Sequence, residues 1–120
     1  FFFTHKPAYE ILSGLVGSEM CIRDRCKSNI LLKGNTTFIG SNKKIIKNTH
    51  SSSELAVIGS GDVLAGIIAS LVGDNKMSII EAAAAAAWLH GDIARKYGKG
   101  LISEDLIKGI QSGLDRLAKK

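Results

Sequence analysis

The stretch Gly59-Ser60-Gly61-Asp62-Val63-Leu64-Ala65-Gly66 marks the point where the strands of this chain give way to helices. The sequence from Val63 to Val72, in which Ser70 is the only polar residue, predicts a helix directly behind the glycine-rich turn. The free N–H groups and the positive dipole end at such a helix start attract an anion. A bulky side chain at Gly59 or Gly61 would block the approach of a ligand. The stretch therefore predicts a phosphate-binding turn.

Asp62 opens the predicted helix and has two interpretations. As a structural residue it is a helix-capping carboxylate, which is the ordinary role of aspartate in an isolated Gly-X-Gly-Asp string. As a functional residue it is a general base facing the hydroxyl to which a phosphate is moved. Gly66 lies inside the helix, where glycine costs ~1 kcal/mol relative to alanine, so it predicts a very close backbone or ligand.

The residues upstream of the turn predict short strands. Ile30-Leu31-Leu32 is a continuous apolar run, typical of a strand buried on both faces. Thr36–Ile39 and Lys44–Lys47 are β-prone runs that predict a hairpin around Gly40–Lys43. A polar, serine-rich loop from Asn48 to Glu54 follows.

Two further helices are predicted downstream of the first. Ser78 can cap the second, with Glu81 completing a capping box, and that helix runs through six alanines, Ala82–Ala87, towards Tyr97. Ser103 is predicted to cap the last helix, whose apolar residues keep helical spacing and leave one face polar.

The helix from Val63 to Val72 and the alanine-rich helix have no polar face, so both need to be enclosed. A strand, a hairpin and one amphipathic helix are too little to enclose them, because small domains bury a lesser share of their surface. The fold class is therefore predicted as α/β. The chain would be the C-terminal part of a larger three-layer domain, with a strand and a hairpin followed by three helices.

Residues 1–25 do not match the rest. They show no sustained periodicity, and the tail from Leu15 to Arg25 looks like a leader that recurs on unrelated environmental sequences, where adapter was read as coding. We predict that residues 1–25 are a non-native, poorly ordered leader without function, and that residues 26–120 are the partial domain. The alternative is an ordinary helix from Ala8 to Leu15 with a loop behind it.

Composition excludes several classes of protein. The 120 residues carry a net charge of +5, two cysteines and no apolar run of the ~20 residues that a membrane helix needs. The lysines are scattered, without interleaved aromatics, so no nucleic-acid partner is predicted. No His, Cys and Asp grouping has zinc spacing, so no metal ligands are predicted. Cys21 and Cys26 without an export signal favour the cytoplasm.

A second candidate site is Lys33-Gly34-Asn35-Thr36-Thr37, at the end of the first strand. Ligands bind beyond the carboxyl ends of strands in open α/β sheets, where a lysine can reach phosphates. The alternative is a lysine that leaves the sheet for solvent. His90 is interpreted as a partly buried histidine with a backbone partner rather than a catalytic or substrate contact, and His50 as a solvated loop residue. Neither a Gly-X-Ser-X-Gly nucleophile nor a Walker lysine is present.

The segment from Asn29 to Ile110 resembles the C-terminal part of the ADP/ATP-dependent NAD(P)H-hydrate dehydratases, a branch of the ribokinase-like fold. The resemblance rests on an ordered set of motifs: Leu32-Lys33-Gly34, Asn48 before the polar loop, Leu55-Ala56 leading into residues 59–68, the alanine-rich helix with Trp88-Leu89-His90-Gly91, and Leu101 through Asp105-Leu106. Four positions depart from the common pattern. Ser51-Ser52 replaces Gly-Asn, Ile58 replaces a glycine, and Ser60 replaces a frequent threonine.

The resemblance implies repair of hydrated NADH or NADPH with consumption of ADP or ATP, accompanied by Mg²⁺. It implies that Lys33, Gly34, Asn35, Thr36 and Thr37 contact the nucleotide, together with Gly59, Ser60 and Gly61. Asp62 would contact the substrate and deprotonate its hydroxyl, which takes up a phosphoryl group and leaves as phosphate. Because the N-terminal part of that domain is missing, the isolated chain is expected to be inactive.

Other possibilities stay open at this stage. One is a ribokinase-like kinase for a thiazole or pyrimidine alcohol, and another is a non-catalytic module that binds a partner through its apolar helices. The parent protein is expected to be a homo-oligomer. The sequence leaves open the choice between ADP and ATP and the presence of a fused epimerase domain.

Overall fold

A computed structural model describes residues 2–4, 29–41 and 44–119. Its elements are the strands β1 (Phe2–Thr4), β2 (Ile30–Leu32), β3 (Thr37–Gly40) and β4 (Ile45–Asn48), the short 3₁₀ helix η1 (Ser53–Leu55), and the helices α3 (Ser60–Gly73), α4 (Ile79–Tyr97), α5 (Ser103–Lys108) and α6 (Ile110–Ala118). The α/β class and the order of a strand, a hairpin and then helices are as predicted. None of the described helices combines the length and hydrophobicity needed to cross a membrane.

The four strands form one antiparallel sheet in the order β1-β4-β3-β2. The predicted hairpin is confirmed, with Ile39 opposite Ile46. β2 is only half-buried, so the prediction of a strand buried on both faces is wrong. The reason is its place at the end of the described sheet, where it bonds only to β3. β1 falls inside the segment predicted to be a poorly ordered leader, yet it pairs with β4; the rest of that segment lies outside the described residues.

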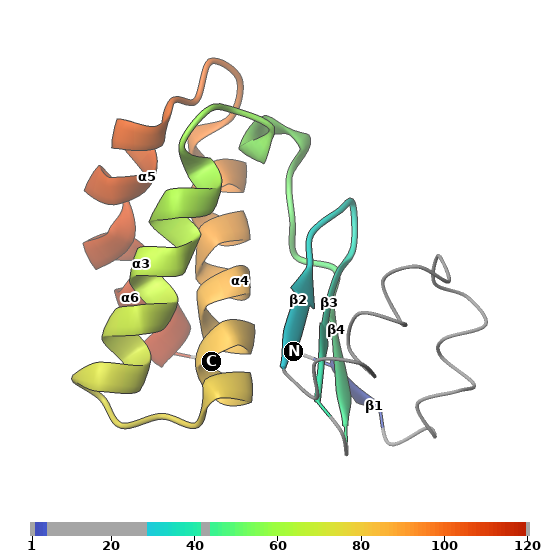
Figure 1. Ribbon diagram of the computed structural model, residues 1–120. Helices are drawn as coiled ribbons and strands as arrows, with labels where there is room; N and C mark the ends of the chain where they lie inside the picture. Colours follow the sequence, from blue (N-terminus) through green and yellow to red (C-terminus); the bar gives the residue numbers. More distant parts are fainter. Residues whose placement is uncertain (1, 5–28, 42–43, 120) are drawn as a thin grey trace.

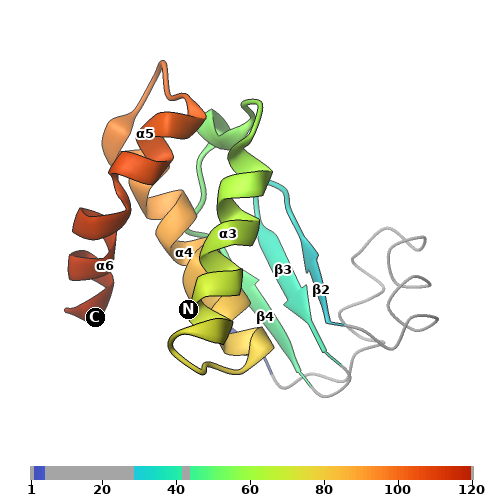
Figure 2. The same ribbon diagram turned by 60° about the vertical axis from the view of Figure 1, so that its left-hand side comes forward.

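The helices cover one face of the described sheet, with α4 against the strands and α5 and α6 beyond it (Figures 1 and 2). Where α4 meets the sheet, Ile39 and Ile46 pack on Ala83, Ala84 and Ala87. Every residue from Ala82 to Ala94 is buried, which confirms that the alanine-rich helix is enclosed. The small side chains permit this, since helix and sheet can approach closely.

α3 is enclosed less completely than its composition predicts. Leu64 and Ile67 are buried against α4, but Ala65, Gly66 and Ala69 on the outer side are exposed. A Cβ at Gly66 would meet nothing within 4 Å, so the close neighbour predicted there is not found in the described part of the chain.

The predicted helix termini are partly correct. Ser78 caps α4, and its hydroxyl accepts the N–H of Glu81 at 3.3 Å. Ser103 does not cap α5; the N-cap is Ile102, whose N–H donates to the carboxylate of Asp105 at 3.0 Å. The hydroxyl of Ser103 instead donates to the carbonyl of Ile58, a contact that local sequence does not reveal.

The last predicted helix is divided at Gly109 into α5 and α6. Glycine is needed because the chain presses on α4 at this point: a Cβ at Gly109 would lie 2.5 Å from Ile93 Cγ2. One turn on, a Cβ at Gly113 would lie 2.4 Å from Leu89 Cδ1. Close packing of α6 on α4 therefore depends on these two glycines.

Candidate functional site

The glycine-rich turn opens α3 with a backbone conformation that suits glycine. Gly59 has φ +85° and forms the N-cap, and a Cβ on it would lie 2.8 Å from the hydroxyl oxygen of Ser103. The N–H groups of Gly61 and Asp62 belong to the first helical turn and receive no acceptor from the residues that the structure describes. Two donors at the positive end of a helix are thus left for an anion.

Three side chains hold this turn in place. The hydroxyl of Ser60 donates to the carbonyl of Leu55 at 2.6 Å, and Nε2 of His90 donates to the carbonyl of Ser60 at 2.9 Å. The third is Ser103, which binds the carbonyl of Ile58. Because they come from α3, α4 and α5, the position of the turn depends on the packing of the helices.

His90 is buried, with 2% of its surface exposed, and its backbone partner confirms the structural interpretation. Burial lowers the pKa of His90 from 6.5 to about 4; the positive charge of Lys33 acts in the same direction, and the hydrogen bond to Ser60 opposes both. His90 is therefore neutral at pH 7. A charged imidazole here would be repelled by Lys33 and by the positive end of α3, whereas the neutral ring serves to position the backbone.

Lys33 lies beside the glycine-rich turn. A Cβ at Gly61 would lie 3.8 Å from Nζ of Lys33, so the end of β2 and the start of α3 meet although 28 positions separate Lys33 from Gly61. The ammonium group and the helix N-terminus carry the same sign of charge. Their juxtaposition is the arrangement that a phosphate stabilises.

Next to Lys33 is a cavity of about 310 Å³. It is lined by three groups of residues: Lys33, Gly34, Asn35 and Thr37 after β2; Ser51, Ser52, Ser53, Leu55 and Ala56 from the loop after β4; and Leu64, Ala87 and His90 from the helices. We call this space the phosphate cavity. Four of the five residues predicted in the lysine segment line it; Thr36 does not.

The glycine-rich turn and Asp62 are placed differently. Gly59, Ser60 and Gly61 are not among the residues that line the phosphate cavity, although Gly61 adjoins Lys33. Asp62 is exposed and lines a separate, mostly apolar groove of about 560 Å³ with residues of α3 and α6, Ile110 and Leu114 among them. Lys33 and Asp62 thus line different hollows, and residues near the start of α3 line both of them.

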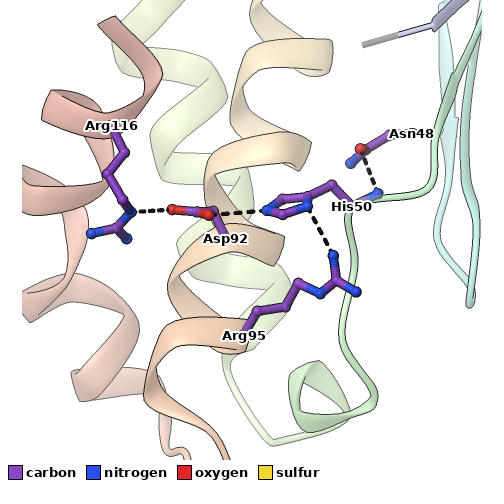
Figure 3. A network of polar contacts seen from close by, with 5 residues as sticks. All are labelled: Asn48, His50, Asp92, Arg95 and Arg116. Atoms are coloured by element: carbon purple, nitrogen blue, oxygen red, sulfur yellow. Dashed lines mark hydrogen bonds and ion pairs between the residues drawn. The ribbon is translucent and has the colours of Figure 1, made fainter. Parts of the chain in front are cut away.

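Sequence reasoning missed a network around His50, which is not a solvated loop residue (Figure 3). Its ring stacks on Trp88 with centroids 4.9 Å apart. Nδ1 accepts from Arg95 at 3.0 Å, so the proton lies on Nε2, which donates to Asp92 at 3.0 Å. Arg116 of α6 donates to the other carboxylate oxygen of Asp92 at 2.5 Å.

Asp92 is buried at the centre of this network. Burial by itself would raise the pKa of Asp92, but the hydrogen bonds from His50 and Arg116 outweigh it and hold the pKa below its usual value. The sequence did carry a signal. Trp88, Asp92 and Arg95 share one face of α4, and Gly91 between them is a helix-weakening residue that implies close approach of another backbone.

This α/β chain brings a lysine to a glycine-rich helix start, an arrangement that can hold an anion. Residues 9–111 match the sequence profile of the NAD(P)H-hydrate dehydratase family, and the chain belongs to this family, which is ribokinase-like. The matched range begins inside the segment predicted to be a leader, whose foreign origin stays a prediction.

Three relatives illustrate the similarity. The ADP-dependent (S)-NAD(P)H-hydrate dehydratase of Neisseria meningitidis is 41% identical over 91 residues, which are 72% of this chain and 27% of that protein. The enzyme of the same name from Natrialba magadii is 34% identical, over 87% of this chain and 40% of that protein. The bifunctional NAD(P)H-hydrate repair enzyme Nnr of Archaeoglobus fulgidus is 35% identical, over 77% of this chain and 20% of that protein. The chain therefore spans between a fifth and two fifths of these relatives.

Proposed function

We propose that this chain supplies the nucleotide-phosphate site and the catalytic carboxylate of an ADP-dependent dehydratase that acts on hydrated NADH or NADPH. The observation that carries the proposal is the position of the Lys33 ammonium beside Gly61, at the start of α3. The names of the relatives favour ADP over ATP and dehydration over a kinase reaction on a thiazole or pyrimidine alcohol.

In this proposal the nucleotide lies along the phosphate cavity. Lys33 binds its phosphates, and Gly34, Asn35, Thr36 and Thr37 contact the remainder. Gly59, Ser60 and Gly61 contribute backbone at the helix start, where the N–H group of Gly61 is available for a phosphate oxygen. Ser60 also anchors the turn through its hydroxyl.

Asp62 is proposed as the general base. It takes the proton of the substrate hydroxyl, the hydroxyl oxygen attacks the terminal phosphorus of ADP, and the bond to the departing AMP breaks. The carbon–oxygen bond then breaks as the ring nitrogen donates its electron pair, and phosphate leaves. The neighbouring ring carbon then loses a proton to water, which restores the carbon–carbon double bond of the cofactor and the neutral ring nitrogen. The groove that Asp62 lines is mostly apolar and is separate from the phosphate cavity, so substrate and nucleotide would reach the start of α3 from different hollows.

Mg²⁺ is proposed to accompany the nucleotide and to neutralise phosphate charge. The described residues contain no group of three or more His, Cys, Asp or Glu side chains that could hold a metal ion. Phosphate oxygens with at most one carboxylate suit Mg²⁺, which keeps several of its waters. Mg²⁺ would therefore be held mainly by phosphate oxygens and water, and Asp62 stays free to act as the base.

The complete protein is proposed to act in the cytoplasm as a homo-oligomer. The cysteine content supports a reducing compartment. The apolar side chains of Ile58, Ile79, Ile102 and Ile107 are exposed, which supports their contact with further protein surface in the complete protein. The 120-residue chain by itself is proposed to lack turnover, because the remaining length of the relatives would supply the rest of the cleft.

Two measurements test the function. Titration calorimetry should detect ADP binding to the chain and a loss of about tenfold or more in affinity for Lys33→Ala. In the full-length protein, Asp62→Asn should abolish release of phosphate from hydrated NADPH while ADP still binds. Unchanged turnover in Asp62→Asn would remove the general base from the mechanism, and phosphate retained on the product would identify a kinase.

A further inference from the structure

We propose that His50 is a positioning residue that holds the serine wall of the phosphate cavity, the segment Ser51–Ser53, and that it does so through Asp92 and Arg116. The inference rests on the proposed nucleotide function and adds a link from the C-terminal helix α6 to the nucleotide site. None of these three residues touches the proposed ligand, so the effect passes through the loop backbone.

The first observation is the number of independent contacts that hold His50. Its ring stacks on Trp88 and bonds at both nitrogens, to Asp92 and to Arg95. Its own N–H donates to Oδ1 of Asn48 at 3.1 Å. A half-buried loop side chain fixed in this way has little freedom, so the backbone that follows it starts from a defined place (Figure 3).

The second observation is the close approach of the loop to α4. A Cβ at Gly91 would lie 1.9 Å from the carbonyl oxygen of His50 and 3.0 Å from Cα of Ser51. The adjacent residue, His90, lines the phosphate cavity, and so do Ser51, Ser52 and Ser53. One turn of α4 therefore fixes both the loop and the helical wall of the cavity.

The third observation is the path from the serine wall to the glycine-rich turn. The hydroxyl of Ser52 accepts the N–H of Glu54 at 3.2 Å and caps η1. The carbonyl of Leu55, at the end of η1, accepts the hydroxyl of Ser60 at 2.6 Å. A displacement at His50 would thus reach both the cavity wall and the start of α3.

The charges make Asp92 the fixed point of this network. Its carboxylate has 6% of its side-chain surface exposed, and Nε2 of His50 and Nε of Arg116 take one oxygen each. A buried carboxylate that loses a partner is destabilised, because desolvation is no longer compensated. Arg95 and Lys96 line the same hollow as this network, so positive charges outnumber negative charges around Asp92.

The test compares two variants of His50 in the 120-residue chain. His50→Phe keeps an aromatic ring against Trp88 and removes both ring hydrogen bonds, whereas His50→Gln can still donate to Asp92. Gln111→Ala serves as the control, since it removes an exposed contact on α6, the 3.4 Å bond to Asp115, away from the cavity. Three quantities are measured: amide hydrogen exchange of residues 51–56, ADP affinity, and the melting temperature.

His50→Phe should speed exchange at residues 51–56 by about tenfold and weaken ADP binding by about tenfold, equivalent to ~1.4 kcal/mol. His50→Gln and Gln111→Ala should stay within about twofold of the wild-type chain in both quantities. A purely structural role would lower the melting temperature of His50→Phe and His50→Gln alike, without selective exchange at 51–56.

The inference is overturned if His50→Phe leaves exchange at residues 51–56 unchanged, or if His50→Gln fails to restore it. Absence of ADP binding by the wild-type chain would count against the proposed function, and the exchange measurement would still decide the positioning role. Tight ADP binding by His50→Phe, alongside normal binding by the wild type, would overturn the inference and leave the proposed function intact.

Discussion

Replacing Gly91 with alanine should destabilise this chain, although glycine-to-alanine changes inside helices ordinarily stabilise by about 1 kcal/mol. The added Cβ would lie 1.9 Å from the carbonyl oxygen of His50, which is a backbone atom that no side-chain rotation can remove. The loop would have to retreat by about 1.5 Å to reach the 3.4 Å of ordinary contact. Such a retreat also stretches the 3.0 Å bond from His50 to Asp92 beyond hydrogen-bond reach.

The magnitude follows from these two changes. Overpacking costs about 1–3 kcal/mol, and a lost hydrogen bond to a charged group costs about 1.5–3 kcal/mol. After the gain of about 1 kcal/mol in helix propensity, the net loss for Gly91→Ala should be about 3 kcal/mol. In a domain of this size that lowers the melting temperature by about 15 °C.

Urea unfolding, followed by the fluorescence of Trp88, the single tryptophan, measures this loss. Gly66→Ala is the matched control, because Gly66 is also inside a helix but a Cβ there would meet nothing within 4 Å. That variant should gain about 1 kcal/mol. If Gly91→Ala were as stable as the wild type, the close approach of the loop to α4 would be refuted.

Further predictions concern the remaining charged groups. Asp62→Asn in the full-length protein should lower turnover by at least about a hundredfold while ADP affinity, measured by calorimetry, stays within about twofold. Lys33→Ala should weaken ADP binding by about tenfold, and the remaining affinity should depend less on salt because an ion pair is gone. The pKa of His90 is lowered to about 4 in the folded chain, so the unfolded chain binds a proton at a higher pH than the folded chain does. The free energy of unfolding should therefore fall by ~3 kcal/mol as the pH drops from about 6.5 to about 4. His90→Gln should flatten this part of the pH dependence, measured by urea unfolding. The pKa of Asp92 is also lowered, so its contribution to stability is present above pH 3.8 and is lost as the pH falls below that value. Asp92→Asn should remove this second loss of stability at acid pH. If both variants removed the same loss, the assignment of one loss to His90 and the other to Asp92 would be contradicted.

Some features followed directly from local sequence. The hairpin was predictable because alternating β-prone residues flank a glycine-containing turn, and the capping of α4 by Ser78 was predictable because a cap involves only neighbours in the chain. The glycine-rich turn before Val63 and the helix behind it were also recognisable, since two glycines and a helix start are contiguous in sequence. A backbone partner for His90 was predicted and is found in Ser60, although His90 is more deeply buried than predicted.

Other features depended on partners far along the chain. Ser103 looks like a helix cap in sequence, but its hydroxyl binds Ile58, 45 positions away. His50 looks like a loop residue because its partner Asp92 is 42 positions away. β2 reads as a doubly buried strand because an apolar run does not reveal where in a sheet the strand lies.

The proposed roles of Lys33 and Asp62 show the same difference between what local sequence reveals and what distant partners decide. Each was identified from its own motif, but no pattern of residues could say whether the two would meet. In the structure Lys33 adjoins Gly61 and lines one cavity, while Asp62 lines a separate groove.

The amino-acid sequence alone determined the element types, the glycine-rich turn before a helix and the family, because these depend on periodicity and on residues that are adjacent in the chain. Only the tertiary structure decided which hollow each candidate residue lines, and that hydrogen bonds join His50, Asp92 and Arg116. The physical reason is that side-chain packing and buried hydrogen bonds join residues by proximity in space, which local propensity does not encode.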